Sequence, residues 1–300
     1  MSTDPLSGMI GLLQPRAVFS KVISGAGRWA VRYSDFGQPS FCAVFEGCCL
    51  LAVDRQPPIM LTAGDFVLLP ATPGFSMTSL EPGTPVVIDA RAAARSPAGE
   101  TRHGTRGGRP DVRMLGGYFE FESPDTSLLV SLLPAVVHVR GAPRLPMLVE
   151  LVREESLERR PGRDLVLARL VELLLIESLR AVPEKQAEPG LLRGMSDKRL
   201  AAALRHMHGN PARAWTVEQL AQKSALSRSA FFDRFSRAVG LPPMEYLLAW
   251  RMAVAKNLLR REDLPIAEVA EKVGYGSAST FSTAFSRHVG QPPGRYARMR

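Results

Sequence analysis

The stretch WTVEQLAQKSALSRSAFFDRFSRAVGLPPMEYLLAW, residues 215–250, is followed about 50 residues later by a second version of itself. Upstream of Ser227 the two versions match at a shift of 49 residues, so the second carries one extra turn residue at Tyr275-Gly276. Downstream the shift is 50, and it places Ser227, Ser229, Phe231, Phe235, Ser236, Arg237, Val239, Gly240, Pro242, Pro243 and Tyr246 on Ser277, Ser279, Phe281, Phe285, Ser286, Arg287, Val289, Gly290, Pro292, Pro293 and Tyr296. Two copies of one small helical unit explain this pattern.

Each copy has the pattern of a short helix, a tight turn and a longer helix. Ser227 can cap the longer helix of the first copy, and the four-residue spacing of Phe231 and Phe235 predicts a buried stripe on it. Gly240 and Gly290, each followed by Pro-Pro, end the longer helices. The pattern predicts two helix-turn-helix units; the alternative is an ordinary helical domain with an internal duplication.

The distribution of charge separates these two interpretations. Residues 196–300 contain 17 Lys and Arg against 8 Asp and Glu, whereas residues 1–195 contain 21 of each, so the net charge of +9 belongs to the C-terminal third. A basic excess confined to the duplicated region is typical of a protein that contacts the phosphate backbone. Double-stranded DNA is therefore the expected partner.

The second copy resembles the AraC/XylS family of bacterial transcription regulators. The resemblance rests on GYGSASTFSTAFSRHVGQPPGRY, residues 274–296, preceded by LPIAEVA, residues 264–270. It implies two helix-turn-helix units joined by one rigid helix over residues 244–261. Such a helix would be about 27 Å long. That length suits two recognition helices placed about 34 Å, or one DNA turn, apart.

The same resemblance implies which residues contact DNA. It assigns phosphate contacts to arginines, any one of which could instead be simply solvated: Arg228, Arg234, Arg237, Arg251 and Arg287. It assigns base contacts to Ser229, Phe232 and Asp233 in the first copy and to Ala278, Ser279, Thr280 and Thr283 in the second.

Residues 18–89 have a sequence pattern typical of β-strands. Short apolar runs at 29–33, 41–45, 49–53 and 66–69 alternate with Gly, Pro and Asp turns, which predicts a sandwich or barrel. FEGC at 45–48 followed by LTAGDFVLLP at 61–70 resembles the two core motifs of cupins. The predicted fold class is α+β with two domains: a cupin-like barrel with following helices at 1–182, a linker at 183–195, and an all-α domain with two helix-turn-helix units at 196–300.

The cupin motifs of this chain lack metal-binding histidines. Cys42 and Phe75 occupy places where the resemblance leads us to expect histidine, and no His occurs before His103. We therefore expect no metal, no cofactor and no catalysis. Cys42, Glu46 and Phe75 are the candidate effector contacts, in an apolar pocket suited to an apolar or thiol-reactive molecule or an oxidant. The alternative for Cys42 is a small buried core residue, which is the more common role for a cysteine on a strand. Strand alternation predicts that Cys48, rather than Cys49, shares its face.

Two helices are expected over residues 144–159 and 164–182. The apolar face of the second is broad, which fits either a homodimer surface or packing against the barrel. No apolar run is long enough to span a membrane, and the start of the chain lacks the pattern of a secretion signal. Three cysteines are too few for a disulfide framework and suit a reducing compartment. The expected location is the cytoplasm.

Together these features predict a sequence-specific transcription regulator in which the cupin-like domain senses a small molecule or oxidant. We expect it to act as an activator and to contact RNA polymerase. Two alternatives belong to other classes. A methyl-accepting DNA-repair regulator would need a zinc-binding cysteine cluster, and this chain has no Cys-x-x-Cys. A cupin enzyme with a DNA-binding tail would need a metal site, which metal analysis would reveal.

Overall fold

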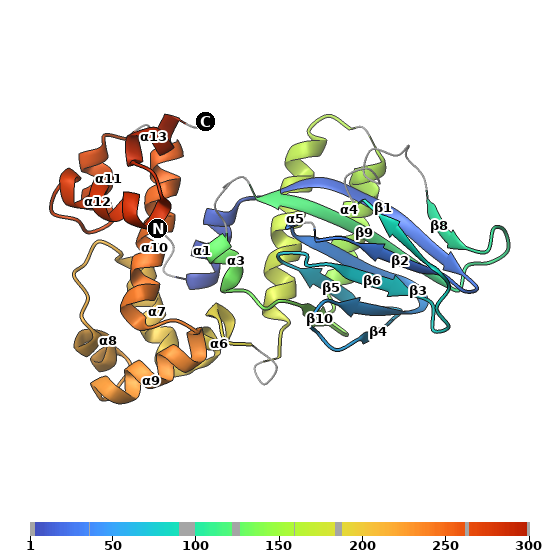
Figure 1. The fold of residues 1–300 in the computed structure, drawn as a ribbon, viewed down its shortest axis with the longest axis horizontal. Helices are drawn as coiled ribbons and strands as arrows, with labels where there is room; N and C mark the ends of the chain where they lie inside the picture. Colours follow the sequence, from blue (N-terminus) through green and yellow to red (C-terminus); the bar gives the residue numbers. More distant parts are fainter. Residues whose placement is uncertain are drawn as a thin grey trace. The chain divides into compact units, whose positions relative to one another are not determined.

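The computed structural model of the protein describes residues 4–35, 37–89, 100–121, 127–158, 160–183, 188–261 and 264–298. The chain folds into two compact units (Figure 1). One unit comprises residues 14–122 and 134–183 and contains the described strands; the other comprises residues 1–13, 123–133 and 184–300 and is helical. The predicted α+β organisation in two domains is confirmed.

The β-unit is one curled sheet of ten strands. Its main path runs β7-β2-β6-β3-β9-β1-β8, while β4 and β5 pair with β3, and β10 pairs with β5. The strands are β1 (Pro15–Ala26), β2 (Ala30–Tyr33), β3 (Ser40–Val53), β4 (Ile59–Thr62), β5 (Phe66–Leu69), β6 (Phe75–Thr78), β7 (Pro85–Ile88), β8 (Thr101–Gly104), β9 (Val112–Phe121) and β10 (Val137–Val139). The inward residues of this sheet form an apolar core.

Strand β3 is the longest strand and pairs with four others. The sequence predicted two separate strands here, at 41–45 and 49–53, but the structure has one continuous strand with a register shift between Val44 and Glu46. Gly47, with φ +74°, bends the strand where the carbonyl of Asp111 leaves no room for a side chain. This bulge lets the first half of β3 pair with β5 and β9 and the second half with β4 and β6.

The turn from β4 to β5 is the second cupin-like motif, and it is held by the buried carboxylate of Asp65. This carboxylate accepts a hydrogen bond from the backbone N–H of Thr62 at 2.9 Å and one from Nε of Arg140 at 3.0 Å. Nε2 of His138 lies 3.2 Å away. Burial acts to raise the pKa of Asp65, but these three groups together hold it below its usual value.

Helices α4 (Leu145–Leu157) and α5 (Arg163–Arg180) pack on each other and on β1. The broad apolar face of α5 is divided in the structure. One part is buried, and consists of Leu167, Val171, Leu174, Leu175 and Leu179. Another part is exposed, and consists of Leu165, Val166 and Leu173. Packing against the sheet therefore accounts for the first part, and the predicted homodimer stays a prediction for the second.

The helical unit contains the two predicted helix-turn-helix pairs. Its C-terminal elements are α6 (Leu191–Ser196), α7 (Lys198–Gly209), α8 (Val217–Lys223), α9 (Arg228–Val239), α10 (Pro243–Arg261), α11 (Ile266–Lys272), α12 (Ala278–Val289) and α13 (Pro293–Arg298). Helices α8 and α9 form the first pair, α11 and α12 the second, and α10 is the continuous helix predicted between them. Part of the predicted linker, residues 184–187, lies outside the described residues, and residues 191–195 belong to α6.

Two segments from earlier in the chain belong to this helical unit, namely α1 (Pro5–Leu13) and α3 (Ser127–Ser131). The predicted division placed residues 1–182 together, whereas α1 buries its apolar side chains against α6, α7 and α10. A methyl group added at Gly8 would lie 3.3 Å from the Trp250 ring and 3.4 Å from Nδ1 of His208. Close helix packing thus explains why α1 groups with the C-terminal helices.

His208 is fully buried in this packing. Its ring stacks on Trp250 with centroids 3.6 Å apart, and its Nε2 lies 2.6 Å from the hydroxyl of Tyr246. Burial lowers the pKa of His208 to about 3, with Asp4 acting in the opposite direction. The folded protein therefore holds this imidazole neutral at physiological pH.

We expect the helical unit to lose stability as the pH falls from about 6.5 towards 3. The unfolded chain takes up a proton on His208 near pH 6.5, while the folded chain does not, so the loss reaches on the order of 2 kcal/mol at pH 5. Urea unfolding followed between pH 7.5 and 5 measures it. His208→Gln should flatten this dependence, and His288→Gln, at an exposed position, should leave it unchanged. Equal pH dependence in all three proteins would contradict the assignment.

Candidate DNA-binding interface and effector cavity

The two longer helices, α9 and α12, begin and end in the same way. Ser227 accepts a hydrogen bond from the N–H of Ala230 at 3.3 Å, and Ser277 accepts one from the N–H of Thr280 at 3.1 Å. Gly240 and Gly290 end the helices with φ of 84° and 83°, a conformation that favours glycine. The repeated serines and glycines of the sequence therefore set equivalent bounds for the two helices.

Aromatic contacts attach each longer helix to the helix that follows it. Phe235 of α9 meets Tyr246 of α10 edge-on at 5.6 Å, and Phe285 of α12 meets Tyr296 of α13 in the same way at 5.5 Å. Phe231 and Phe235 are completely buried, which confirms the predicted stripe, and so are their equivalents in the second copy, Phe281 and Phe285. The opposite face of each helix is left to solvent.

The residues predicted to contact bases lie on these outer faces. Those that are exposed are Ser229, Phe232 and Asp233 on α9 and Ser279, Thr280 and Thr283 on α12, while Ala278 is half-buried. Thr280 and Thr283 also have local hydrogen-bond partners, since Thr280 Oγ1 lies 2.9 Å from Ser277 Oγ and Thr283 Oγ1 donates to the carbonyl of Ser279 at 3.1 Å. Contact with bases stays a prediction for all of them.

The predicted phosphate-binding arginines differ in what they already contact. Arg237 and Arg287 are exposed and form no ion pair with any other described residue. Nε of Arg228 lies 2.7 Å from Glu218 Oε1, and Arg234 pairs with Asp197. The Arg228–Glu218 pair is at the surface, where such a contact is weak enough to exchange for a phosphate. In the second pair the Asp197 side chain is only 16% exposed and also caps α7.

Arg251 is in a different position. Its Nε donates to the carbonyl of Pro211 at 2.7 Å, and one Nη donates to the carbonyl of Arg213 at 2.8 Å. Burial lowers its pKa, with Tyr275 acting in the opposite direction. These bonds hold the segment before α8 against α10, so the geometry supports a structural role for Arg251 and does not leave these two donor groups open to phosphate.

A basic hollow that the sequence analysis did not identify lies beside the first helix-turn-helix. We use "basic hollow" for the concave surface lined by Arg193, Ser196, Asp197, Lys198, Arg199, Arg234, Arg237 and Ala238. Five of these eight residues are cationic and one is acidic, so the hollow favours anions. The charged run at 197–199, just before α7, was the signal available in the sequence.

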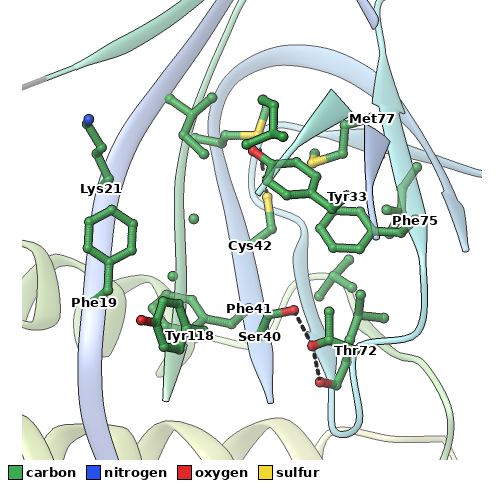
Figure 2. A pocket seen from close by; sticks show the side chains of 18 of the residues that line it. Phe19, Lys21, Tyr33, Ser40, Phe41, Cys42, Thr72, Phe75, Met77 and Tyr118 are labelled. Carbon is green, nitrogen blue, oxygen red and sulfur yellow. Dashed lines mark hydrogen bonds between the residues drawn. The ribbon is translucent and has the colours of Figure 1, made fainter. Parts of the chain in front are cut away.

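The β-unit contains an apolar cavity of about 130 Å³. It is lined by residues of eight described strands and of the loop between β5 and β6, and Figure 2 shows 18 of these residues. Those lining residues include Phe19, Lys21, Ile23, Tyr33, Ser40, Phe41, Cys42, Leu51, Val67, Leu69, Thr72, Phe75, Met77, Ile88, Thr101, Met114, Gly116, Gly117 and Tyr118. A side chain at Gly116 of β9 would collide with Ile23, and one at Gly117 would collide with the Phe19 carbonyl and Phe41. Glycine at both positions therefore leaves room for these neighbouring groups in the cavity wall.

Two of the three predicted effector residues line this cavity. Phe75 stacks on Tyr33 at 4.7 Å (Figure 2). Sγ of Cys42 lies 3.5 Å from Sδ of Met114. Burial, followed by the proximity of Cys49, raises the pKa of the Cys42 thiol far above its ordinary value. The thiol is therefore protonated at neutral pH, and a protonated thiol is a poor nucleophile.

Glu46 and Cys48, in contrast, are not among the residues that line the cavity. The carboxylate of Glu46 is exposed and lies 3.7 Å from Arg113 Nη1. Simple alternation along β3 predicted Cys48 on the inner face, but Cys49 is the fully buried one. The bulge between Val44 and Glu46 adds one residue to the strand and reverses the alternation after it.

Lys21 is a cavity residue that the sequence analysis missed. It lies on β1 between Phe19 and Ile23, two residues from each, and all three line the cavity. Its partner across the sheet is Gly116 of β9. Among the described lining residues it is the one with a charged side chain, and it forms no ion pair with a described residue. The two-residue alternation of a lysine with apolar residues was the signal available in the sequence.

The two arginines Arg251 and Arg237 give opposite expectations on replacement. Arg251→Ala removes two hydrogen bonds and leaves the carbonyl of Pro211 without a described donor, so it should destabilise the helical unit by about 1–3 kcal/mol. Arg237→Ala should leave stability unchanged and reduce the slope of log affinity against log salt by about 0.9. Thermal unfolding and DNA titrations at several salt concentrations measure the two effects. An Arg251→Ala protein of unchanged stability would contradict the structural role.

Within the described parts of the chain, no group of three or more His, Cys, Asp or Glu side chains is arranged to hold a metal ion. No helix in these parts is long and apolar enough to cross a membrane.

Comparison with known proteins identifies both units. A cupin family model matches residues 4–184, and a helix-turn-helix domain model matches residues 220–299. A putative AraC-like transcription regulator of Streptomyces lividans is 37% identical over 98% of this chain and 97% of its own. An uncharacterized HTH-type transcriptional regulator of Haemophilus influenzae is 28% identical over 98% of each chain.

Among solved structures, the DNA-binding domain of AdpA in complex with a target DNA is 31% identical; the match covers 33% of this chain and 86% of that one, with a TM-score of 0.30. The two family models and the full-length similarity to the Streptomyces regulator agree with the duplicated helix-turn-helix and the curled sheet. The chain belongs to the AraC-like family of DNA-binding transcription regulators, with a cupin domain in its N-terminal part.

Proposed function

We propose that this regulator binds a small, mostly apolar molecule in the cavity of its β-unit and that this binding changes its activity at promoters. The observation that supports the proposal is the cavity itself, because its walls are aliphatic and aromatic with few polar groups. Ser40 and Thr72, two of the polar residues, bond to each other at 2.7 Å. Such a lining does not offer the many hydrogen bonds that a sugar requires.

The chemistry of the wall favours a molecule with one acidic or hydrogen-bond-accepting group. Lys21 supplies a cation without a described counter-ion, and the hydroxyl of Tyr33 has no hydrogen-bond partner among the described residues. Burial and the neighbouring Cys42 raise the pKa of Tyr33 to about 12, so the phenol keeps its proton and can donate. A carboxylate or carbonyl oxygen would complement either group.

Oxidant sensing by Cys42 is the second candidate, because the thiol does line the cavity. Its raised pKa favours an apolar lining role over reaction, since oxidants attack the thiolate. Cys49 is buried as well, and burial, followed by Cys48 and Asp65, raises its pKa to about 12. Promoter output in Cys42→Ser cells challenged with hypochlorite separates the two candidates, because only oxidant sensing requires the sulfur.

The wider role follows from the family. We propose that the protein acts in the cytoplasm without catalytic activity of its own, as a homodimeric activator that contacts RNA polymerase. The exposed leucines of α5 support a dimer surface, although they do not identify its partner. Sedimentation of the full chain with and without DNA tests the dimer.

Filling the cavity should abolish the response to small molecules. Cys42→Phe adds a ring to the cavity wall, whereas Glu46→Gln changes a predicted effector residue that lies outside the cavity and serves as the matched control. Promoter output is compared in cells given octanoate, octan-1-ol, benzoate or toluene. We expect the Cys42→Phe protein to bind DNA but to respond to none of them. A normal response in that variant would contradict the cavity assignment. Loss of response in Glu46→Gln would show that the effector site includes residues outside the cavity.

The charge of Lys21 should distinguish acids from neutral molecules. Lys21→Met should weaken octanoate or benzoate binding about tenfold or more, the loss expected when a charge-assisted hydrogen bond is removed. Binding of octan-1-ol or toluene should stay within a factor of about two of wild type. Calorimetric titration of the purified protein measures all four. Equal weakening of acids and neutral molecules would show that Lys21 supports the wall without selecting charge.

A further inference from the structure

The two recognition helices, α9 and α12, differ at several outer positions, and at one of them α9 exposes an aromatic ring. Phe232 of α9 is 43% exposed, although the four other phenylalanines of these helices are fully buried. The equivalent residue of the second copy, 50 positions later, is Ser282. Because α12 has the same caps, length and buried aromatic pair as α9, the fold does not need a ring at this position.

An exposed ring on this face has a restricted choice of contacts on DNA. Phe232 lies on the same outer face as Ser229 and next to Asp233, and both of these are exposed. Phosphates and most base edges are polar, and the C5 methyl group of thymine is the apolar feature of the major groove. Burying a ring against that methyl removes apolar surface of both from water.

From this arrangement we infer that Phe232 is a specificity-determining residue, which selects a thymine by packing on its methyl group in the major groove that α9 enters. The inference rests on the predicted placement of α9 in DNA and adds what that helix selects. The adjacent Asp233 supports the placement of this helix face against base edges. Asp233 forms no hydrogen bond or ion pair with a described residue, and an unpaired carboxylate there repels phosphate and can accept a hydrogen bond only from a donor such as the amino group of cytosine.

The second helix offers no ring at the equivalent position. Its outer face carries Ser279, Thr280, Ser282 and Thr283, and the hydroxyls of both threonines are already engaged locally. Hydroxyl groups accept and donate, so they discriminate poorly between bases. The sensitivity to a thymine methyl that depends on Phe232 should therefore lie in one half of the bipartite site, the half contacted by α9.

Replacing thymine with uracil tests this inference, because uracil pairs identically and lacks only the methyl group. A binding site is first selected with the purified full-length protein from duplexes of random sequence. Each thymine of the selected duplex is then replaced singly by uracil, and affinities are measured at fixed salt for wild type, Phe232→Ala and the matched control Ser282→Ala. Thermal unfolding confirms that each variant is folded, as expected for exposed or half-exposed positions.

We expect one uracil in the half-site contacted by α9 to weaken wild-type binding about fourfold, which corresponds to the burial of one methyl group. Phe232→Ala should bind the thymine duplex about as weakly as wild type binds the uracil duplex, and it should not distinguish the two. Ser282→Ala should keep the full thymine preference.

Two results would overturn the inference: uracil tolerated by wild type at every position of the half-site contacted by α9, or a thymine preference in that half-site that persists in Phe232→Ala. The second would assign the methyl contact to another side chain. Failure of the selection to enrich any sequence would instead refute sequence-specific DNA reading by this protein, and the inference with it, so the two failures are distinguishable.

Discussion

Helix α10 is the part of the helical unit on which both helix-turn-helix pairs depend. Its Tyr246 receives the edge of Phe235 from α9 and lies against His208 of α7, while Arg251 one turn further on bonds to the backbone before α8. The far end of α10 packs against α11 and α13. Because these contacts are made by side chains of one continuous helix, the spacing of the two recognition helices is fixed by helix geometry and not by a flexible linker.

Much of this unit could be predicted from the sequence, because the duplication shows which residue types occur at the same position in both copies. Ser227 and Ser277, or Gly240 and Gly290, act through local backbone chemistry that a sequence displays directly. Arg251 could not be assigned in this way. Whether an arginine meets a phosphate or a backbone carbonyl depends on the loop that folds beside it, and the Pro211–Arg213 segment lies about 40 residues away in the chain.

The cavity shows a different limit. The type of lining was predictable, since Cys42 and Phe75 occur in apolar strands, but the inward or outward direction of later residues on β3 was not. A single bulge reversed the alternation, so Cys49 took the inner face and Glu46 went to solvent. Lys21 was missed for a related reason, since the pairing of β1 with the glycines of β9 is a long-range contact. The local hydrophobic pattern therefore predicts where strands occur, whereas the pairing between strands decides which side of the sheet each residue faces.

The position of α1 has a practical consequence for work with fragments. A fragment cut at residue 196, the predicted start of the DNA-binding domain, would lack α1 and α6, whose apolar side chains cover parts of α7 and α10. Trp250 and His208 would then lose the close cover that the backbone at Gly8 provides. Such a fragment would expose apolar surface to solvent and would tend to aggregate. That aggregation would result from the missing helices and would not be a property of the intact regulator.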